Sequence, residues 1–484
     1  MRTREFCSLV VGLVYCTVAN ARNIPSNIGQ IQHKVVSLST QRKPVSNPLH
    51  RDRLRRRGSS VEAALDNEET LYFVNATIGT PAQSLRLHLD TGSSDLWVNT
   101  PTSSLCAERG EPCDFAGSYV ANDSSTYEYV GSWFNISYVD GSGASGDYVS
   151  DTITIGGTTL DKLQFGIGYV SSSSQGILGI GYPSNEVQVG RAQKAAYDNL
   201  PAALASGGQI SRNAYSLWLN DLDASRGSIL FGGVDTAQYT GDLQTLPIQA
   251  NGGVYSEFLI TLTALKLGNT TVADNQALAV LLDSGSSLTY LPDELVDAIY
   301  EQVDAQYDSS AGAAYVPCSL ASNTSLSTLD FTFSSPTISV DMGELVLDLV
   351  TSNGGRPTFN DGTEACLFGV APAGEGTNVL GDTFLRSAYV VYDIDNNQIS
   401  LAQTKFNAST SAVQEIPTGT SIPGATVVAN SVAATSGVVR TDGNGDAGLG
   451  DATSGGAVAL AASLSTYVFA LLSMGFATFI TLHG

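Results

Sequence analysis

The stretch LHLDTGSS at residues 87–94 returns almost unchanged as VLLDSGSS at residues 280–287. In each copy an apolar run leads into an acidic residue, a hydroxyl residue, glycine and two serines. The aspartates, Asp90 and Asp283, are 193 residues apart, and an apolar-apolar-Gly element follows each of them, ILG at 177–179 and VLG at 379–381. A lone Asp-Thr-Gly is usually only a turn. Two copies with matched downstream elements predict a duplicated domain.

The residue pattern around both copies is typical of an all-β fold. Between residues 70 and 401, short runs of Val, Ile, Thr, Tyr and Phe alternate with polar residues and are interrupted by Gly, Asn, Asp and Ser. We expect strands that include 72–78, 85–89, 152–155, 258–262 and 389–393. Helical patterns are short, at 292–305 and more weakly at 192–205. We expect an N-terminal β lobe at 58–250 and a C-terminal β lobe at 251–406.

The first 57 residues have the composition of a leader. Residues 1–21 combine two arginines, an apolar run and a small-residue end, which is typical of a secretory signal peptide. Residues 22–57 are basic, have no convincing apolar period and end in RLRRR, so we interpret them as a propeptide cut at this cluster. A solvated basic linker is the alternative. The leader holds 11 of the 23 basic residues, and its charge suggests that it masks the acidic remainder until the pH falls.

The other end of the chain is typical of a lipid anchor signal. Residues 407–456 are rich in Ser, Thr, Gly and Ala, as in a flexible stalk, and residues 457–484 form an apolar tail with no Lys, Arg, Asp or Glu after Asp451. This order predicts glycosylphosphatidylinositol (GPI) attachment at Asn444, Gly445 or Ser454. A membrane helix that stays in place is the alternative. We therefore expect export to the cell surface, on the plasma membrane or cell wall.

Cysteines and glycosylation motifs agree with export. Two of the six cysteines leave with the signal peptide, and an oxidising compartment predicts disulfides among the others. Cys106 with Cys113 and Cys318 with Cys366 is the pairing that keeps each bridge within one half of the chain. A metal site is disfavoured because no CxxC pair occurs and histidine is scarce. Candidate N-glycosylation asparagines are Asn75, Asn122, Asn135, Asn269, Asn323 and Asn407.

The net charge of the chain limits the classes of partner that it can bind. A formal net charge of −23 argues against nucleic-acid binding, which needs a basic surface. Few basic residues also limit the self-repulsion that unfolds many proteins in acid. We expect a monomer that needs no cofactor or metal.

Together these motifs resemble the pepsin family of aspartic proteases, and within it the fungal cell-surface group of yapsins and candidapepsins. The resemblance covers residues 70–406 and rests on DTGSSDLWV at 90–98, YVDGS at 138–142, GILGIG at 176–181, DSGS at 283–286 and VLGDTFLR at 379–386. It implies a bilobal fold with pseudo-twofold lobes, a central cleft, and an aspartic endopeptidase that binds peptides in extended form. Ser284 stands where many relatives have Thr, which keeps the hydroxyl group.

The resemblance also implies roles for the site residues. Asp90 and Asp283 would share one proton and act as base and acid on water at acidic pH, because two close carboxylates do not both ionise readily. Gly92 and Gly285 would present backbone N–H groups, Thr91 and Ser284 would cross-link the loops, and Ser93 and Ser286 would bind the outer carboxylate oxygens. The ILG and VLG elements would brace these loops from behind.

A hairpin between strands at 133–138 and 148–155 would carry the family's flap, with Tyr138, Asp140 and Gly141 at its tip. Trp97 would bind the Tyr138 hydroxyl. Seen alone, Tyr138 would more often be a packing residue. Asp140, and Asp95 near the cleft, would either attract basic residues of a substrate or be solvated surface carboxylates.

Three other functions are weighed against this interpretation. A catalytically silent binding or cell-wall protein on the same fold would be expected to lack one Asp, the flap Tyr or the propeptide, and this chain has all of them. A zinc protease is disfavoured because the histidines at 33, 50, 88 and 483 form no HExxH. A serine hydrolase is disfavoured because no Gly-x-Ser-x-Gly elbow has a suitable histidine.

Overall fold

The computed structural model describes residues 34–45, 69–138, 142–224, 226–349 and 355–438. The predicted signal peptide, the arginine cluster at 53–57, Asp140, Gly141, and the anchor candidates Asn444, Gly445 and Ser454 lie outside these ranges. In the described part, no helix is both long and apolar enough to cross a membrane.

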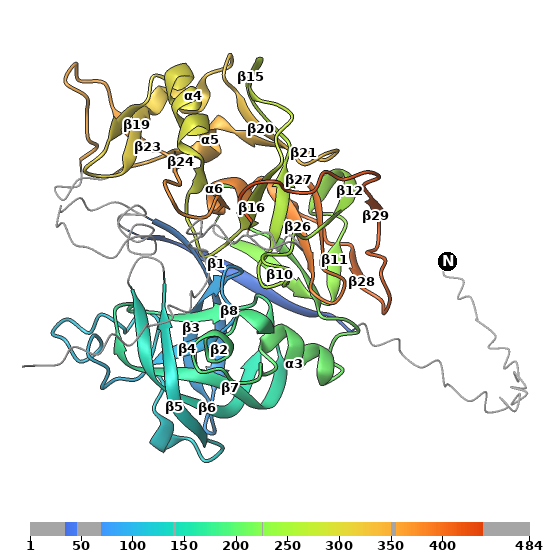
Figure 1. Ribbon diagram of the computed structural model, residues 1–484. Coiled ribbons are helices and arrows are strands. Elements are labelled where there is room, and N and C mark those ends of the chain that lie inside the picture. The colour runs from blue at the N-terminus through green and yellow to red at the C-terminus, as the bar shows by residue number, and fades with distance from the viewer. Residues whose placement is uncertain (1–33, 46–68, 139–141, 225, 350–354, 439–484) are drawn as a thin grey trace, which may run out of the picture. The chain divides into compact units, whose positions relative to one another are not determined.

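The described chain is nearly all strand, as predicted, and fourteen strands form one sheet (Figure 1). In spatial order they are β29 (Ala425–Val427), β12 (Tyr239–Pro247), β27 (Gln398–Thr404), β26 (Ala388–Asp393), β9 (Ala214–Trp218), β10 (Arg226–Phe231), β1 (Val36–Val45), β2 (Glu69–Ile78), β3 (Gln83–Asp90), β8 (Gly176–Gly179), β4 (Leu96–Asn99), β7 (Thr158–Ser171), β6 (Gly143–Ile155) and β5 (Glu128–Ser137). Strands from both halves of the chain share this sheet.

Four smaller sheets complete the described β structure. One has five strands, β13 (Leu259–Leu262), β16 (Leu278–Leu282), β25 (Val379–Leu380), β17 (Thr289–Leu291) and β24 (Val370–Pro372). A second sheet has four strands, β15 (Thr270–Ala273), β14 (Ala264–Leu267), β20 (Thr328–Thr332) and β21 (Thr337–Asp341). A third also has four, β18 (Gln306–Asp308), β19 (Ala313–Pro317), β23 (Ala365–Phe368) and β22 (Val346–Leu347). The last pairs β11 (Gly233–Asp235) with β28 (Val413–Glu415).

Within the described ranges, helices are few and short. They are η1 (Ala121–Asp123), η2 (Pro183–Asn185), α2 (Val187–Gly190), α3 (Leu200–Ser206), α4 (Asp293–Val303), η3 (Cys318–Ser322), α5 (Met342–Leu345) and α6 (Asp382–Leu385). The expected helix at 292–305 is α4, whose buried side chains recur every three to four residues. The weaker prediction at 192–205 is wrong before residue 200. Asn199 caps the start of α3, and Pro201 lies in its first turn. Proline is tolerated at a helix start but not inside a helix, so a helix that contains Pro201 cannot begin as far back as residue 192.

The two halves repeat one strand arrangement, as the duplicated motif predicts. In the first half β3 runs parallel to β8, which is antiparallel to β4, and β4 is parallel to β7. In the second half β16 runs parallel to β25, which is antiparallel to β17, and β17 is parallel to β24. The ILG and VLG elements are the central strands β8 and β25. Each therefore lies beside the strand that leads to an aspartate.

Part of the predicted propeptide is a strand of the main sheet. β1 pairs antiparallel with β10 on one side and β2 on the other (Figure 1). Val36, Leu38 and Thr40 are buried and their neighbours are not, so the strand has the apolar alternation that sequence analysis did not recognise. A threonine on the buried face and the basic residues that follow weaken that alternation in the sequence.

The predicted stalk begins later than expected. Residues 407–438 lie against the preceding fold, where β28 pairs with β11 and β29 runs parallel to β12. Ile416 and Ile422 are buried, and the Ser436 backbone bridges to Leu278 at the start of β16. A flexible stalk can therefore begin only after residue 438. Spaced apolar residues among Ser, Thr and Gly hide this packing from a composition argument.

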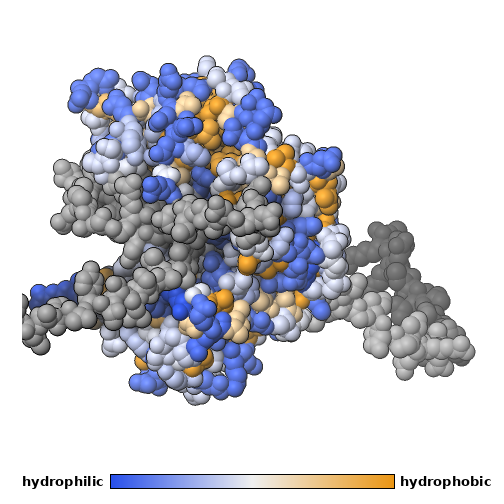
Figure 2. All heavy atoms as spheres, in the orientation of Figure 1, coloured by the Kyte–Doolittle hydropathy of each residue, from blue (hydrophilic) through white to orange (hydrophobic). Residues whose placement is uncertain are grey.

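Apolar side chains fill the interior between these elements. On the face shown in Figure 2, hydrophobic residues occur in small separate groups among hydrophilic ones.

Candidate active site

Asp90 and Asp283 occupy equivalent places in the repeated arrangement. Asp90 is the last residue of β3, and Asp283 directly follows β16. Their exposed fractions are only 1% and 5%. Ile180 N–H donates to the Asp90 carbonyl at 3.0 Å, and Asp283 N–H donates to the Leu380 carbonyl at 3.2 Å. The strands that carry ILG and VLG thus hold both aspartates from behind.

The two carboxylates have the same hydrogen-bond partners within their own loops. One oxygen of Asp90 accepts from Gly92 N–H at 2.9 Å and the other from the Ser93 hydroxyl at 2.6 Å. For Asp283 the donors are Gly285 N–H at 2.7 Å and the Ser286 hydroxyl at 2.7 Å. Each loop therefore fixes both oxygens of its own carboxylate.

Thr91 and Ser284 cross-link the two loops. The Thr91 hydroxyl donates to the Leu282 carbonyl at 2.9 Å and accepts from Ser284 N–H at 2.9 Å. The Ser284 hydroxyl donates to the Leu89 carbonyl at 3.0 Å and accepts from Thr91 N–H at 3.2 Å. These four buried bonds join segments more than 190 residues apart in sequence, so they fix the distance between the loops.

Gly92 shows how closely the second carboxylate approaches the first loop. A Cβ atom added to Gly92 would lie 2.5 Å from Oδ1 of Asp283 and 2.6 Å from its Cγ, which is closer than real Cβ atoms approach other groups. Gly92 also donates its N–H to Asp90. Both carboxylates therefore meet at this glycine, and a residue without a side chain is required there.

The expected hairpin is present and longer than predicted. β5 and β6 pair antiparallel up to Ser137 and Gly143, and Tyr138 N–H donates to the Ser142 carbonyl at 2.8 Å. The indole N–H of Trp97 donates to the Tyr138 hydroxyl oxygen at 2.8 Å. Tyr138 is therefore held to β4, which follows the Asp90 loop.

Asp95 is not where the sequence analysis placed it. The side chain is buried, and one oxygen accepts from the hydroxyls of Tyr148 at 2.5 Å and Tyr197 at 3.0 Å. The other oxygen accepts from Val187 N–H at 2.8 Å. Burial raises the pKa of Asp95, although these hydrogen bonds lower it in part. Both interpretations are therefore wrong, because Asp95 is neither a solvated carboxylate nor exposed to substrate.

Two residues of this region were missed by sequence reasoning. Glu186 is buried beside Asp95, and burial raises the pKa of Glu186 to about 9, although the N–H of Tyr197 lowers it in part. Arg191 donates to the Asn135 carbonyl at 2.7 Å and to the Ser137 hydroxyl, on the β5 side of the hairpin. A lone acid or base in a polar segment gives no signal of its own, and Asp95 follows two serines, so the apolar residues Leu96 and Trp97 after it are the one local sign of burial.

The predicted disulfides are confirmed. Cys106 bonds Cys113 and Cys318 bonds Cys366. Among the described residues, the grouping of possible metal ligands consists of Cys318, Asp348 and Cys366. Its two sulfurs are bonded to each other, so they are not available to a metal ion. The candidate glycosylation asparagines are all exposed: Asn75, Asn122, Asn135, Asn269, Asn323 and Asn407.

Comparisons with known proteins agree with this geometry. The family described as "Eukaryotic aspartyl protease" matches residues 71–404. The "Probable aspartic-type endopeptidase opsB" of Aspergillus oryzae is 57% identical over 419 residues, which cover 85% of this chain and 84% of that one. The "Secreted aspartic protease 8" of Candida albicans is 35% identical over 426 residues, covering 84% and 97%. The solved aspartic proteinase from Irpex lacteus has a TM-score of 0.57 at 24% identity, covering 77% of this chain and 100% of that one, and supports the fold.

The duplicated strand arrangement and the paired carboxylates define an aspartic protease of the pepsin fold. The chain belongs to the eukaryotic aspartyl proteases, and its relatives include fungal aspartic endopeptidases, as the motif resemblance implies. It is an aspartic-type endopeptidase.

Proposed function

We propose that the chain cleaves peptide bonds at acidic pH and that Asp90 and Asp283 together activate the attacking water. The observation that carries the proposal is the approach of the Asp283 carboxylate to Gly92, which also binds Asp90. Two carboxylates that both lie against Gly92 repel each other when both are ionised, so the pair keeps one proton over an acidic range. In that state one member is a base and the other an acid.

The reaction then needs no other catalytic group. The ionised carboxylate takes a proton from water as the water oxygen bonds to the carbonyl carbon, and the protonated carboxyl gives its proton to the carbonyl oxygen. As the tetrahedral intermediate collapses, the carboxyl that took the proton from water gives it to the amide nitrogen, the other carboxylate takes a proton from a hydroxyl of the intermediate, and the C–N bond breaks. A carboxylic acid and an amine leave, and the pair again holds one proton.

The surrounding residues keep the pair in position. Ser93, Ser286 and the N–H groups of the two glycines fix both oxygens of each carboxylate, while Thr91 and Ser284 fix the spacing of the loops. Tyr138 begins the hairpin tip that would close over an extended peptide and exclude water. In this proposal Asp140, which comes two residues after Tyr138 in the sequence, would favour basic residues in the substrate.

The test is cleavage of a mixed peptide library between about pH 2.5 and about pH 7. The enzyme should fold with its leader and then be cut after residue 57, because β1 is part of the main sheet. We expect acid-dependent cleavage that a transition-state analogue blocks and that falls by about a thousandfold or more in Asp90→Asn and in Asp283→Asn. If folded enzyme cleaves nothing, or the variants cleave equally well, a silent binding protein is the better interpretation.

We further propose that the chain is exported, cut at the arginine cluster and anchored to the cell surface. The leader pattern, the two disulfides and a relative named as a secreted protease support export. The apolar tail supports a GPI anchor. Treatment of cells with a phospholipase that cuts such anchors should release the enzyme. A chain truncated before residue 457 should instead appear in the medium without treatment, and retention of that truncated chain on cells would contradict the anchor.

A further inference from the structure

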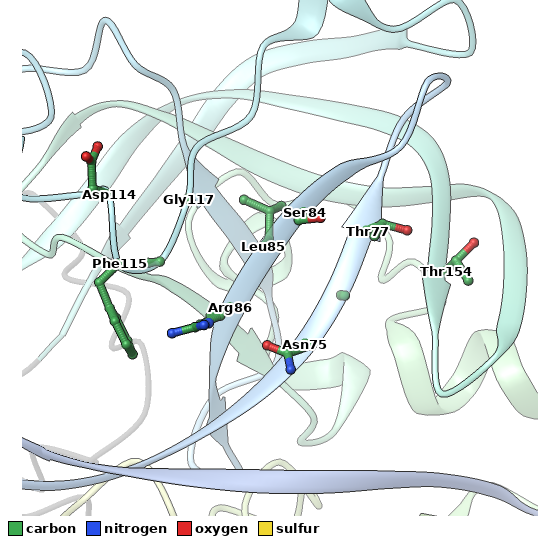
Figure 3. Close-up of a pocket in the computed structure, with 11 residues that line it drawn as sticks. Asn75, Thr77, Ser84, Leu85, Arg86, Asp114, Phe115, Gly117 and Thr154 are labelled. Atoms are coloured by element: carbon green, nitrogen blue, oxygen red, sulfur yellow. The ribbon is translucent and has the colours of Figure 1, made fainter.

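A hollow on the outer face of β2 and β3 lies apart from the catalytic loops. On this face Asn75 pairs with Arg86 and Thr77 pairs with Ser84, while the alternate residues Val74, Ala76, Leu85 and Leu87 point into the core. The segment at 114–117 runs beside β3, where Arg86 N–H donates to the Ala116 carbonyl at 2.8 Å. The β2 and β3 residues of this face, the segment at 114–117 and Thr154 line a hollow of about 610 Å³. Figure 3 shows these residues.

The hollow combines an aromatic ring with polar groups. Phe115 exposes 36% of its surface. Its ring contacts the Phe73 ring edge-on at 5.4 Å between centroids, and the Arg86 guanidinium lies over it at 4.8 Å. Figure 3 shows the Arg86 side chain directed toward Phe115, with Asn75 on the neighbouring strand. The hydroxyls of Thr77, Ser84 and Thr154 and the carboxylate of Asp114 supply hydrogen-bond partners along the wall.

Asn75 differs in its surroundings from the other candidate asparagines. Asn75-Ala76-Thr77 is a glycosylation motif, the Asn75 side chain is exposed, and among the six candidates Asn75 lines the hollow. Asn323 caps a turn through its side-chain oxygen, and Asn407 donates its amide to Asp221. An amide at the rim of a hollow with an aromatic wall is placed to hold its own sugar against that wall.

We infer that this hollow is the seat of an N-linked glycan on Asn75, whose first sugars pack against Phe115 and hydrogen-bond to the polar wall. The volume lies within the range of small-ligand sites, about 300–1,000 Å³. Sugar rings are amphipathic, so their C–H faces cover exposed aromatic surface while their hydroxyls bind polar groups. The occupant is covalently attached, so it loses little freedom on seating.

The glycan is attached to Asn75 by transfer of an oligosaccharide from a lipid carrier. The Asn75 Nδ2 atom forms a bond to the anomeric carbon of the first N-acetylglucosamine of a lipid-diphosphate-linked oligosaccharide. The bond from that carbon to the diphosphate breaks, the lipid diphosphate leaves, and the amide proton passes to the transferase base. Because this transfer occurs in the secretory pathway, the inference rests on the proposed export.

The first measurement is glycopeptide mass spectrometry on the enzyme secreted from a eukaryotic host, with its peptidase activity assayed in the same preparation. We expect Asn75 to be occupied. The folded enzyme is then treated with an endoglycosidase that cuts between the first two sugars. We expect the Asn75 glycan to be cut at least about tenfold more slowly than a glycan on Asn269, which lies in the exposed turn between β14 and β15.

Variants separate packing from mere attachment. Phe115→Ala should make the Asn75 glycan as accessible as that on Asn269, and Phe115→Tyr should keep it protected. Removing the glycan with Asn75→Gln should lower Tm by about 2–4 °C in the parent and not in the Phe115→Ala background. Because each Tm change is measured within its own background, the comparison is valid even if Phe115→Ala is itself less stable.

The outcomes are distinct. An active enzyme with other asparagines occupied and Asn75 bare overturns this inference alone, as does an Asn75 glycan cut as fast as the control. Asparagines that are all bare on the secreted enzyme likewise overturn this inference alone, and loss of peptidase activity with a protected Asn75 glycan overturns only the proposed catalysis.

Discussion

At the scale of single residues, Gly92 is the position where the geometry leaves least room. A methyl group there would overlap the Asp283 carboxylate, so Gly92→Ala must either push that carboxylate away or shift the loop that holds Asp90. We expect kcat to fall by about a hundredfold or more while Tm changes by only a few degrees, because a displacement of about 1 Å in a catalytic group has effects of this size.

Gly343→Ala is the matched control for this substitution. Gly343 lies in α5, and a Cβ there would meet only the Asp341 side chain at 3.1 Å and one carbonyl at 3.9 Å. Steady-state kinetics and thermal melts of both variants make the comparison. If Gly92→Ala keeps most of its kcat, the carboxylates are not held as close as the structure indicates.

At the scale of elements, the sequence predicted the strands and the duplicated loops well, because both rest on local patterns. The apolar run before each aspartate and the glycine after it specify a strand and a tight turn without distant help. β1 and residues 407–438 were misjudged because their stability comes from pairing with distant strands. Asp95 was misjudged for the same reason, since its partners Tyr148, Val187 and Tyr197 come from later elements.

Arg191 holds one strand of the flap hairpin. It binds the Asn135 carbonyl and the Ser137 hydroxyl, and Tyr138 follows directly. In Arg191→Ala these bonds are lost and the hairpin should close less often, so we expect kcat/KM to fall about tenfold, mainly through a higher KM. Arg191→Lys should recover part of the loss.

Lys194→Ala is the control for Arg191, since Lys194 lies over the Trp133 ring at 3.9 Å on the same side of the hairpin. Peptide kinetics at several substrate concentrations separate KM from kcat. A fall in Tm with unchanged kcat/KM per folded molecule would mean that Arg191 stabilises the lobe without positioning the flap.

The carboxyl-terminal segment is the second element whose role is testable. Residues 413–438 bury Ile416 and Ile422, and the Ser436 backbone pairs beside β16, which leads to Asp283. Each buried isoleucine contributes about 1.5–3 kcal/mol. A chain that ends at residue 438 should match the full chain in Tm and kcat, whereas one that ends at residue 405 should lose about 10 °C or more in Tm. Equal melting of the two truncated chains would show that the segment contributes nothing.

At the scale of the whole molecule, the charge balance and the buried acids favour the same acidic range. The proposed cut after residue 57 would separate 11 basic and 2 acidic residues from the rest of the chain, which has 12 basic against 44 acidic residues and a formal net charge of −32. That charge is largely neutralised in acid and repels itself near neutral pH. Buried acids with raised pKa values, Glu186 among them, act in the same direction.

Glu186 should make the folded state less stable as the pH rises. Its pKa is about 9 in the folded state and about 4.5 in the unfolded chain, because burial penalises the charged form. Between these values the folded state holds a proton that the unfolded state has released. The stabilising contribution is therefore complete below about pH 4.5 and is lost as the pH rises toward about 9. At pH 7 the stability already lost is roughly 3 kcal/mol.

In Glu186→Gln an uncharged amide of similar shape replaces the carboxyl, so the free energy of unfolding should rise at pH 7 and change little near pH 3.5. Denaturant unfolding at both pH values measures this, with Glu301→Gln on the exposed face of α4 as the control. An equal change at both pH values would show that the packing of Glu186, rather than its ionisation, sets the stability of this region.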